Sequence, residues 1–156
     1  MRITNILPIE RILVDAGGTT VRGKADALKS LSALLAPALG CDEATIESLF
    51  AERERLQSTG IGDGVAIPHT SLEAAATRAA ALVVSRPGIP FDAIDGAPVH
   101  IVLGVVGPKD ATGEHLRVLA RISRLLRDDA TRHALSDAGS AAQAHSILES
   151  REAQLG

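Results

Sequence analysis

The chain has 156 residues, of which 46% are hydrophobic and 1% aromatic, and its formal net charge is −3. This length is enough for one substantial core, and the mixture of basic and acidic residues leaves no broad cationic face for nucleic acid. With two phenylalanines and no tyrosine or tryptophan, stacking on nucleic-acid bases is also not expected.

The N-terminal residues 1–15 lack the basic start, the apolar stretch and the cleavage site of a signal peptide. The longest apolar run, residues 99–106, is too short to cross a bilayer. We therefore expect a cytoplasmic protein without membrane insertion.

Two amphipathic helices are predicted in the first third of the chain. Apolar residues recur at spacings of three and four over residues 24–39, where Pro37 is expected to bend or end the helix. Asp42 is a candidate N-cap for a second helix that runs to about residue 56. Its apolar stripe begins with Ile46, Leu49 and Phe50.

A glycine-rich segment and a short apolar run follow. Residues 58–64 carry three alternate glycines, which permit backbone conformations that other residues avoid, so we predict a shaped loop there. Residues 65–67 are apolar and precede Pro68, which favours an extended backbone in its predecessor. His69 is accordingly expected at the end of a strand.

The second half of the chain predicts two buried strands and then helices. Residues 80–85 and 99–106 are almost continuously apolar, as in strands covered on both faces, and residues 86–90 and 95–98 have turn chemistry. A helix is predicted over residues 112–127 with Thr112 as its N-cap, and shorter helices after it. This order predicts an α/β or α+β fold, with a mixed sheet flanked by helices in a single-domain sandwich.

His69 is the first candidate for chemistry among the five histidines. It follows a proline at the end of a predicted strand, beside a glycine-rich loop whose backbone N–H groups are able to surround an anion. A neutral imidazole is a nucleophile near pH 7 and is able to accept and release a phosphoryl group. From the local sequence alone, a histidine that merely ends a strand is equally compatible with the pattern.

Two further polar residues fall on stripes that are expected to face inward. His115 lies near the start of the predicted helix over residues 112–127, where free N–H groups favour an anion and disfavour a charged ring. Arg53 continues the apolar stripe of the second helix and therefore needs an anionic partner or a route to water. A phosphoryl group or an ordinary carboxylate such as Glu54 or Asp63 would serve equally. A core histidine is the alternative for His115.

Other kinds of site receive no support from the sequence. No two histidines have the spacing of a zinc helix, and the single cysteine, Cys41, has no partner at ligand spacing, so neither a metal nor a cofactor is expected. The glycine-rich segment lacks P-loop and dinucleotide patterns, and no GxSxG elbow is present. No role is assigned to His100, His133 or His145.

Two stretches resemble the active-site signature of the fructose/mannitol and nitrogen-regulatory class of enzyme IIA domains of bacterial phosphotransferase systems. The first begins with Arg-Glu-Arg-Leu at Arg53 and ends with Ser-Thr-Gly-Ile-Gly-Asp-Gly-Val-Ala-Ile-Pro-His at His69. The second is Asp-Ala-Thr-Gly-Glu-His-Leu over residues 110–116. The resemblance implies one enzyme IIA domain over residues 1–156, with a core of about residues 6–148, most like the nitrogen-regulatory subgroup.

The resemblance also implies roles and partners. His69 matches the histidine that the family phosphorylates on Nε2, and the donor is an HPr-type phosphocarrier that receives the group from phosphoenolpyruvate through enzyme I. His115 and Arg53 match the family's second histidine and its arginine, which hold the phosphoryl oxygens. Two departures are Thr70, where many members have glycine, and His100, where an acidic or neutral residue is expected.

Three functions remain open at this point. The first is a regulatory enzyme IIA whose phosphorylation state alters its binding to target proteins. The second is a transport enzyme IIA that passes phosphate to an enzyme IIB for a fructose- or mannitol-like sugar. The third is an interaction module that keeps the fold and is never phosphorylated.

Overall fold

A mixed six-stranded sheet forms the centre of the molecule, which the computed structural model describes over residues 2–155. The strand order is β1-β5-β6-β3-β2, and β4 also pairs with β6. The pairs β1–β5, β3–β6 and β4–β6 are parallel, whereas β5–β6 and β2–β3 are antiparallel. The strands are β1 (Ile12–Asp15), β2 (Gly60–Gly62), β3 (Val65–Ala66), β4 (His69–Leu72), β5 (Ala79–Ile89) and β6 (Val99–Pro108).

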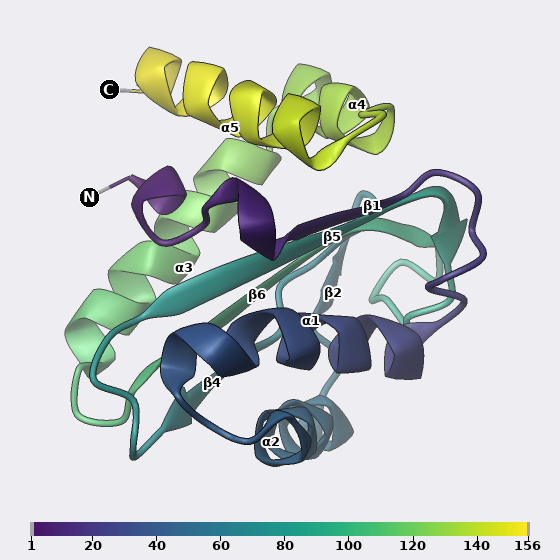
Figure 1. Cartoon of the computed structure of the whole chain (residues 1–156). Coiled ribbons are helices and arrows are strands. Elements are labelled where there is room, and N and C mark those ends of the chain that lie inside the picture. Colours follow the sequence, from purple (N-terminus) through teal and green to yellow (C-terminus); the bar gives the residue numbers. More distant parts are fainter. Residues whose placement is uncertain (1, 156) are drawn as a thin grey trace.

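Helices cover both faces of the sheet, as Figure 1 shows. The helices α1 and α2 lie on one face and α3, α4 and α5 lie on the other. Two 3-10 turns, Ile3–Asn5 and Ile9–Arg11, precede β1. The helices are α1 (Lys24–Leu39), α2 (Glu43–Leu56), α3 (Thr112–Leu126), α4 (Asp129–Ser136) and α5 (Ala141–Leu155). The predicted mixed sheet flanked by helices is confirmed.

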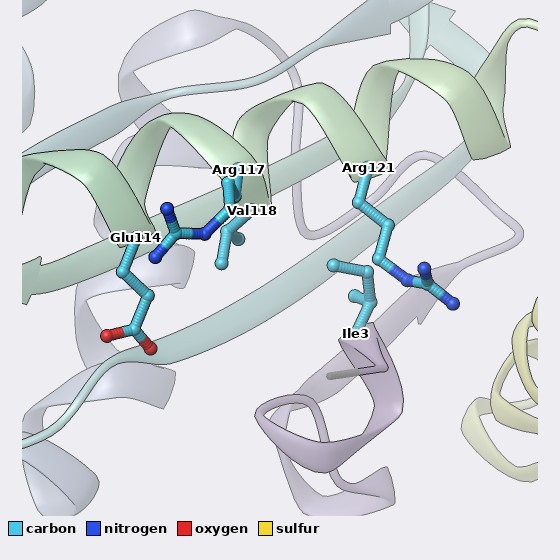
Figure 2. Close-up of a pocket in the computed structure, with 5 residues that line it drawn as sticks. All are labelled: Ile3, Glu114, Arg117, Val118 and Arg121. Atoms are coloured by element: carbon cyan, nitrogen blue, oxygen red, sulfur yellow. The ribbon is translucent and has the colours of Figure 1, made fainter.

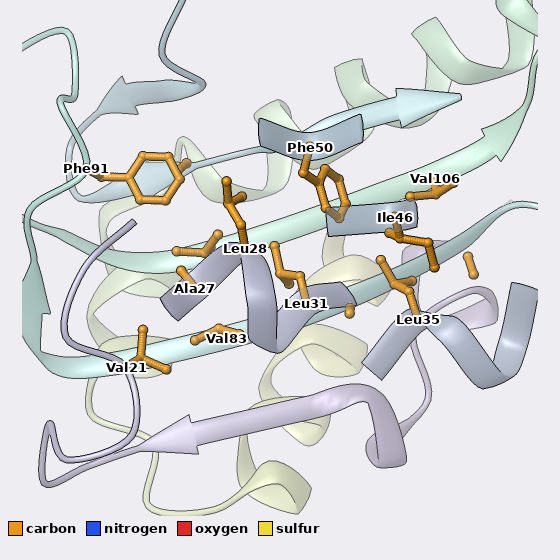
Figure 3. Close-up of a cluster of buried hydrophobic side chains, with 14 of the residues drawn as sticks. Val21, Ala27, Leu28, Leu31, Leu35, Ile46, Phe50, Val83, Phe91 and Val106 are labelled. Carbon is orange, nitrogen blue, oxygen red and sulfur yellow. The ribbon is translucent and has the colours of Figure 1, made fainter. Parts of the chain in front are cut away.

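The two central strands divide the core into two layers because successive side chains of a strand point to opposite faces. Ala81 and Val83 of β5 join the layer under α1 and α2, which Figure 3 shows. Leu82 and Val84 of the same strand join the layer under α3, α4 and α5. This double coverage explains why the central strands are continuously apolar, as the sequence indicates.

The two helices of the first layer begin and end where the sequence predicts. Asp42 caps α2, because its carboxylate accepts a hydrogen bond from the Thr45 N–H at 3.2 Å. Pro37 lies inside α1 and does not end it; the helix continues to Leu39, and Gly40, with a φ of 60°, is its left-handed C-cap.

Two expectations for local structure are wrong, and one strand was missed. Residues 86–89 are not a turn but the end of β5, where the pairing with β6 shifts register and Gly88 has a φ of 85°. Ala111, not Thr112, precedes the first turn of α3, and it has no side-chain cap. Strand β1 was not expected, because four residues carry too little periodicity to be recognised.

Candidate active site

The glycine-rich segment that the sequence indicates as a loop is a small hairpin. Strand β2 runs antiparallel to β3, and Asp63 and Gly64 form the turn between them. Both residues have positive φ angles, 56° and 78°, as a two-residue hairpin turn requires. The Asp63 N–H donates to Asp95 Oδ2 at 3.1 Å, so the turn is also tied to the segment before β6.

A buried carboxylate anchors the start of this hairpin to α2. Glu54 is 8% exposed, and its Oε1 accepts hydrogen bonds from the Thr59 N–H at 2.7 Å and from the Thr59 hydroxyl. Its Oε2 lies 2.9 Å from Lys24 Nζ on α1. These bonds satisfy a group that is costly to bury alone, and they fix the hairpin relative to both helices.

His69 is the first residue of β4 and does not end a strand as expected. β3 and β4 form one line along β6, because Val65 pairs with Ile101 and His69 with Val105. The line is interrupted at Pro68, which has no N–H to donate, although its carbonyl accepts from the Val105 N–H at 2.9 Å.

The backbone holds the His69 ring in one orientation. Its Nδ1 lies 2.7 Å from the Ile67 carbonyl oxygen, which only accepts hydrogen bonds, so this contact assigns the ring proton to Nδ1. In a neutral ring, Nε2 then keeps its lone pair. Because the residue is half-buried, the ring is fixed on one side and reachable from the other.

His115 lies beside this ring, as the sequence predicts. The two ring centroids are 5.8 Å apart, and the planes are tilted by 48°. His115 is half-buried in the first turns of α3, and its Nδ1 has no hydrogen-bond partner among residues 2–155. Burial, the neighbouring His69 and the charge of Arg78 lower the pKa of His115 below the ordinary histidine value. His115 is therefore neutral at pH 7.

Arg53 does not occupy the innermost position that its stripe predicts. The buried residues of α2 are Ile46, Phe50 and Glu54, and Arg53 lies half-buried beside this stripe. Its guanidinium donates to the Gln57 carbonyl at 2.9 Å, at the end of its own helix. Within residues 2–155, neither Glu54 nor Asp63, the carboxylates that the sequence offers as partners, pairs with Arg53. Since α2 contacts β4, Arg53 is nevertheless on the helix that flanks the strand of His69.

Arg78 is a charged residue near the site that sequence reasoning missed. Its side chain is 2% exposed, and its Nη1 lies 3.1 Å from Glu114 Oε1 at the start of α3. It directly precedes β5, after a run of three alanines and a threonine, and no periodicity marks it as buried. The only available signal was a cation directly before a continuously apolar strand.

The remaining histidines and Thr70 lie outside this arrangement or add little to it. Thr70 is half-buried in β4, next to His69. His100 is the second residue of β6, at the far end of the strand from the residues that pair with β4, and is half-buried.

A pocket of about 430 Å³ lies along α3, the helix that carries His115. Figure 2 shows Glu114, Arg117 and Arg121 projecting from one side of this helix, with Ile3 of the first 3-10 turn facing them. Arg121 is already paired with the fully buried Glu152, with 3.0 Å between Nε and Oε2. Its guanidinium therefore serves to join α3 to α5.

Within residues 2–155 no group of three or more His, Cys, Asp or Glu residues is arranged to hold a metal ion. In the same part of the chain, no helix has the length and apolar character needed to cross a bilayer.

A family model matches nearly the whole chain. The model described as "Phosphoenolpyruvate-dependent sugar phosphotransferase system, EIIA 2" matches residues 5–151. This range includes His69, His115, Arg53 and Arg78.

Individual relatives match over almost their full length. A "Nitrogen regulatory protein" of Bradyrhizobium diazoefficiens is 36% identical over 149 residues, which are 95% of each chain. A "PTS system fructose-specific EIIA component" of Haloferax volcanii is 31% identical over 146 residues, which are 94% of each chain. The crystal structure of nitrogen regulatory protein IIA-Ntr from Neisseria meningitidis superposes with a TM-score of 0.86 at 33% identity, covering 94% of this chain and 98% of that one.

Proposed function

The chain belongs to the phosphoenolpyruvate-dependent sugar phosphotransferase system EIIA 2 family, and on this premise we propose that it carries a phosphoryl group on Nε2 of His69. The observation that supports this most directly is the 2.7 Å contact between His69 Nδ1 and the Ile67 carbonyl. It leaves Nε2 as the nucleophilic nitrogen on a half-buried ring beside a second, neutral imidazole.

The transfer step is an in-line displacement. The lone pair of His69 Nε2 attacks phosphorus, and the bond between phosphorus and the nitrogen of a phosphohistidine donor breaks as that nitrogen leaves with the electron pair. Positive charge then develops on the His69 ring, and the Ile67 carbonyl at Nδ1 stabilises it. Transfer to an acceptor runs the same step in reverse.

We assign His115 and Arg53 to the phosphoryl oxygens. A neutral His115 ring has one N–H to donate, and its lowered pKa keeps this form at pH 7. Arg53 brings a positive charge on the helix that contacts β4, and its present bond is to a neutral carbonyl. A guanidinium gains more from the charged oxygens of a phosphoryl group than from one carbonyl.

The donor is an HPr-type phosphocarrier, and residues 1–156 act as one enzyme IIA type 2 domain with a core over residues 6–148. Exposed apolar side chains near the site support a protein partner. Leu116, directly after His115, is 60% exposed, and Leu56, at the end of the helix of Arg53, is 83% exposed. Such side chains are typical of protein interfaces.

The regulatory branch is the role that we favour, with target proteins that respond to phosphorylation. The Bradyrhizobium relative and the Neisseria structure support it, since both are named nitrogen regulatory proteins. A transport role, with an enzyme IIB as acceptor, is the second candidate, because the Haloferax relative is named a fructose-specific EIIA component.

The experiment is incubation with phosphoenolpyruvate, enzyme I and either a sugar-branch or a nitrogen-branch phosphocarrier, followed by intact mass spectrometry. We expect one acid-labile phosphoryl group on the wild type and none on His69→Gln. The faster carrier identifies the branch. Absence of phosphate with both carriers would contradict the proposed function and would leave the interaction module as the better account.

A further inference from the structure

Arg78 is a buried cation near the site that the proposed function does not use. The residue is 7% exposed and its side chain 2%. Burying a guanidinium is costly unless its N–H groups have partners, and in Arg78 both terminal nitrogens have partners, whereas the buried Nε has none among residues 2–155. The contacts of Arg78 therefore indicate what the residue does.

Two of these contacts reach the first turn of α3. Nη1 lies 3.1 Å from Glu114 Oε1, and Nη2 donates to the Ala111 carbonyl at 3.2 Å. The same carbonyl accepts the backbone N–H of His115 at 3.0 Å. One guanidinium thus binds the two residues that define the backbone position of His115.

The guanidinium also lies against Gly107 of β6. A Cβ on Gly107 would lie 2.7 Å from Nε and 2.8 Å from Nη2 of Arg78, closer than real contacts allow. Gly107 pairs with Ser71, two residues after His69 on β4. The absence of a side chain at Gly107 is what allows the guanidinium to lie this close to the strands.

The first turn of α3 has no side-chain cap, because Ala111 has no hydroxyl or carboxylate to bind the free N–H groups there. The guanidinium of Arg78 only donates hydrogen bonds, so it does not replace a cap, but its two contacts tie this turn to the residue that precedes β5. Its charge also acts on the His115 ring, together with burial and His69.

We propose that Arg78 is a positioning residue for phosphotransfer, which locks the first turn of α3 against β6 and so keeps His115 beside His69. This inference rests on the proposed function of His69. Gly107 is part of the same device, because it provides the space that the guanidinium occupies.

Three variants test the proposal at different severity. Arg78→Gln removes the positive charge and the guanidinium group. Gly107→Ala retains the guanidinium but displaces it, because the new Cβ occupies its space. Glu114→Gln weakens one contact of the guanidinium, at a half-exposed carboxylate. The readout is the single-turnover rate of phosphoryl transfer from the phosphorylated carrier. We expect transfer to slow about tenfold in the first two variants and about threefold in the third, because reacting groups tolerate little misplacement.

The matched control is Arg121→Gln. It breaks a different ion pair of α3, the one between Arg121 and Glu152 of α5, two turns away from His115. We expect this variant to lose thermal stability and to keep the wild-type transfer rate. Equal slowing in Arg121→Gln and Arg78→Gln would overturn the proposal, since general destabilisation would then explain both.

A second readout separates positioning from simple support of the fold. In an NMR titration, Arg78→Gln should raise the pKa of His115, because a neighbouring positive charge is removed, whereas Arg78→Lys should restore the lower pKa and only part of the rate. Wild-type rates and an unchanged His115 pKa in Arg78→Gln and Gly107→Ala would refute the role of Arg78. Failure of the wild type to accept phosphate would instead refute the proposed function.

Discussion

A histidine ring is held by backbone carbonyls near each end of β6: that of His100, which is part of β6, and that of His69 on the neighbouring β4. The surroundings of the two rings differ. Near the start of the strand, His100 Nδ1 lies 3.1 Å from the carbonyl oxygens of both Ser85 and Arg86. Near the other end, His69 lies beside Val105, and its Nδ1 is 2.7 Å from the Ile67 carbonyl. Both arrangements leave Nε2 as the acceptor nitrogen of a neutral ring.

What differs is the set of groups available to a phosphoryl group. His69 has the His115 ring beside it, and the charge of Arg78 acts on that ring. His100 lies between two glycines, and a Cβ on Gly88 would be 2.8 Å from its ring. If His69 rather than His100 is phosphorylated, as we propose, a fixed tautomer is not sufficient for a phosphoryl site. Neighbouring donors that are free to bind the new oxygens are also needed.

The arginines near His100 illustrate this point. Arg86 and Arg132 line the same pocket as His100, but Arg86 donates to the Asp137 carbonyl at 2.6 Å, and Arg132 donates to the carbonyls of Leu126 and Arg127. These guanidinium groups already join β5 and α4 to their neighbours.

The largest expected effect is that of His69→Gln. The amide has no nucleophilic nitrogen, so phosphoryl transfer should be abolished while the fold is retained. Intact mass after incubation with the phosphorylated carrier measures this. A stable phosphoryl group on the variant would show that another residue is phosphorylated, and His100 would be the first to test.

Replacing His115 with Ala should slow transfer by about 10²-fold, as expected for loss of one donor to a charged transition state. Rapid-quench kinetics with the phosphorylated carrier give the rate, and a heteronuclear NMR spectrum checks the fold. A wild-type rate would show that the neighbouring ring is packing only.

For Arg53→Ala we expect a smaller loss, roughly tenfold in the transfer rate, because the guanidinium lies half-buried at the edge of the site. Its matched control is Arg55→Ala, an exposed arginine two residues further along the same helix. Equal rates for the two variants would remove Arg53 from the site.

The lowered pKa of His115 also predicts an effect on stability. Below the ordinary histidine pKa, the unfolded chain binds a proton at this residue that the folded chain does not, so the free energy of unfolding should fall as the pH falls through that range. Denaturant unfolding of the wild type and His115→Ala across this pH range measures the difference. The variant should lose stability less steeply, and identical slopes would contradict the assignment.

The smallest expected effect is that of His100→Ala. Phosphotransfer should stay within about twofold of the wild type, as for other substitutions away from a site. The same rapid-quench assay measures it. A large loss of the phosphotransfer rate would mean that both ends of β6 take part in the reaction, and it would contradict the distinction drawn between His69 and His100.

The sequence predicts those elements best whose stability is local. The bounds of α1 and α2 follow from apolar spacing and from capping residues such as Asp42. The central strands were also predicted, from their continuous apolar runs, but two features that depend on tertiary pairing were not. Strand β1 has four residues, and β5 continues through Pro87 and Gly88 because its neighbour β6 tolerates the shift in register.

The site was predicted from the sequence only in part. His69 and His115 were placed in one site by the family resemblance, and the local sequence predicted only that His115 faces inward; the structure has the two rings 5.8 Å apart. Arg78 could not be placed there, because its partners at Ala111, Glu114 and Gly107 are about 30 residues away in the chain. Long-range contacts of this kind leave no local pattern.

The most direct test of the account is to identify which nitrogen of His69 carries phosphate. Two-dimensional proton–nitrogen NMR of the protein, phosphorylated with ring-labelled histidine, distinguishes the two linkages. The contact between Nδ1 and the Ile67 carbonyl predicts phosphorus on Nε2 of His69, with the Nδ1 proton retained. A phosphoryl group on Nδ1, or on another histidine, would contradict the account.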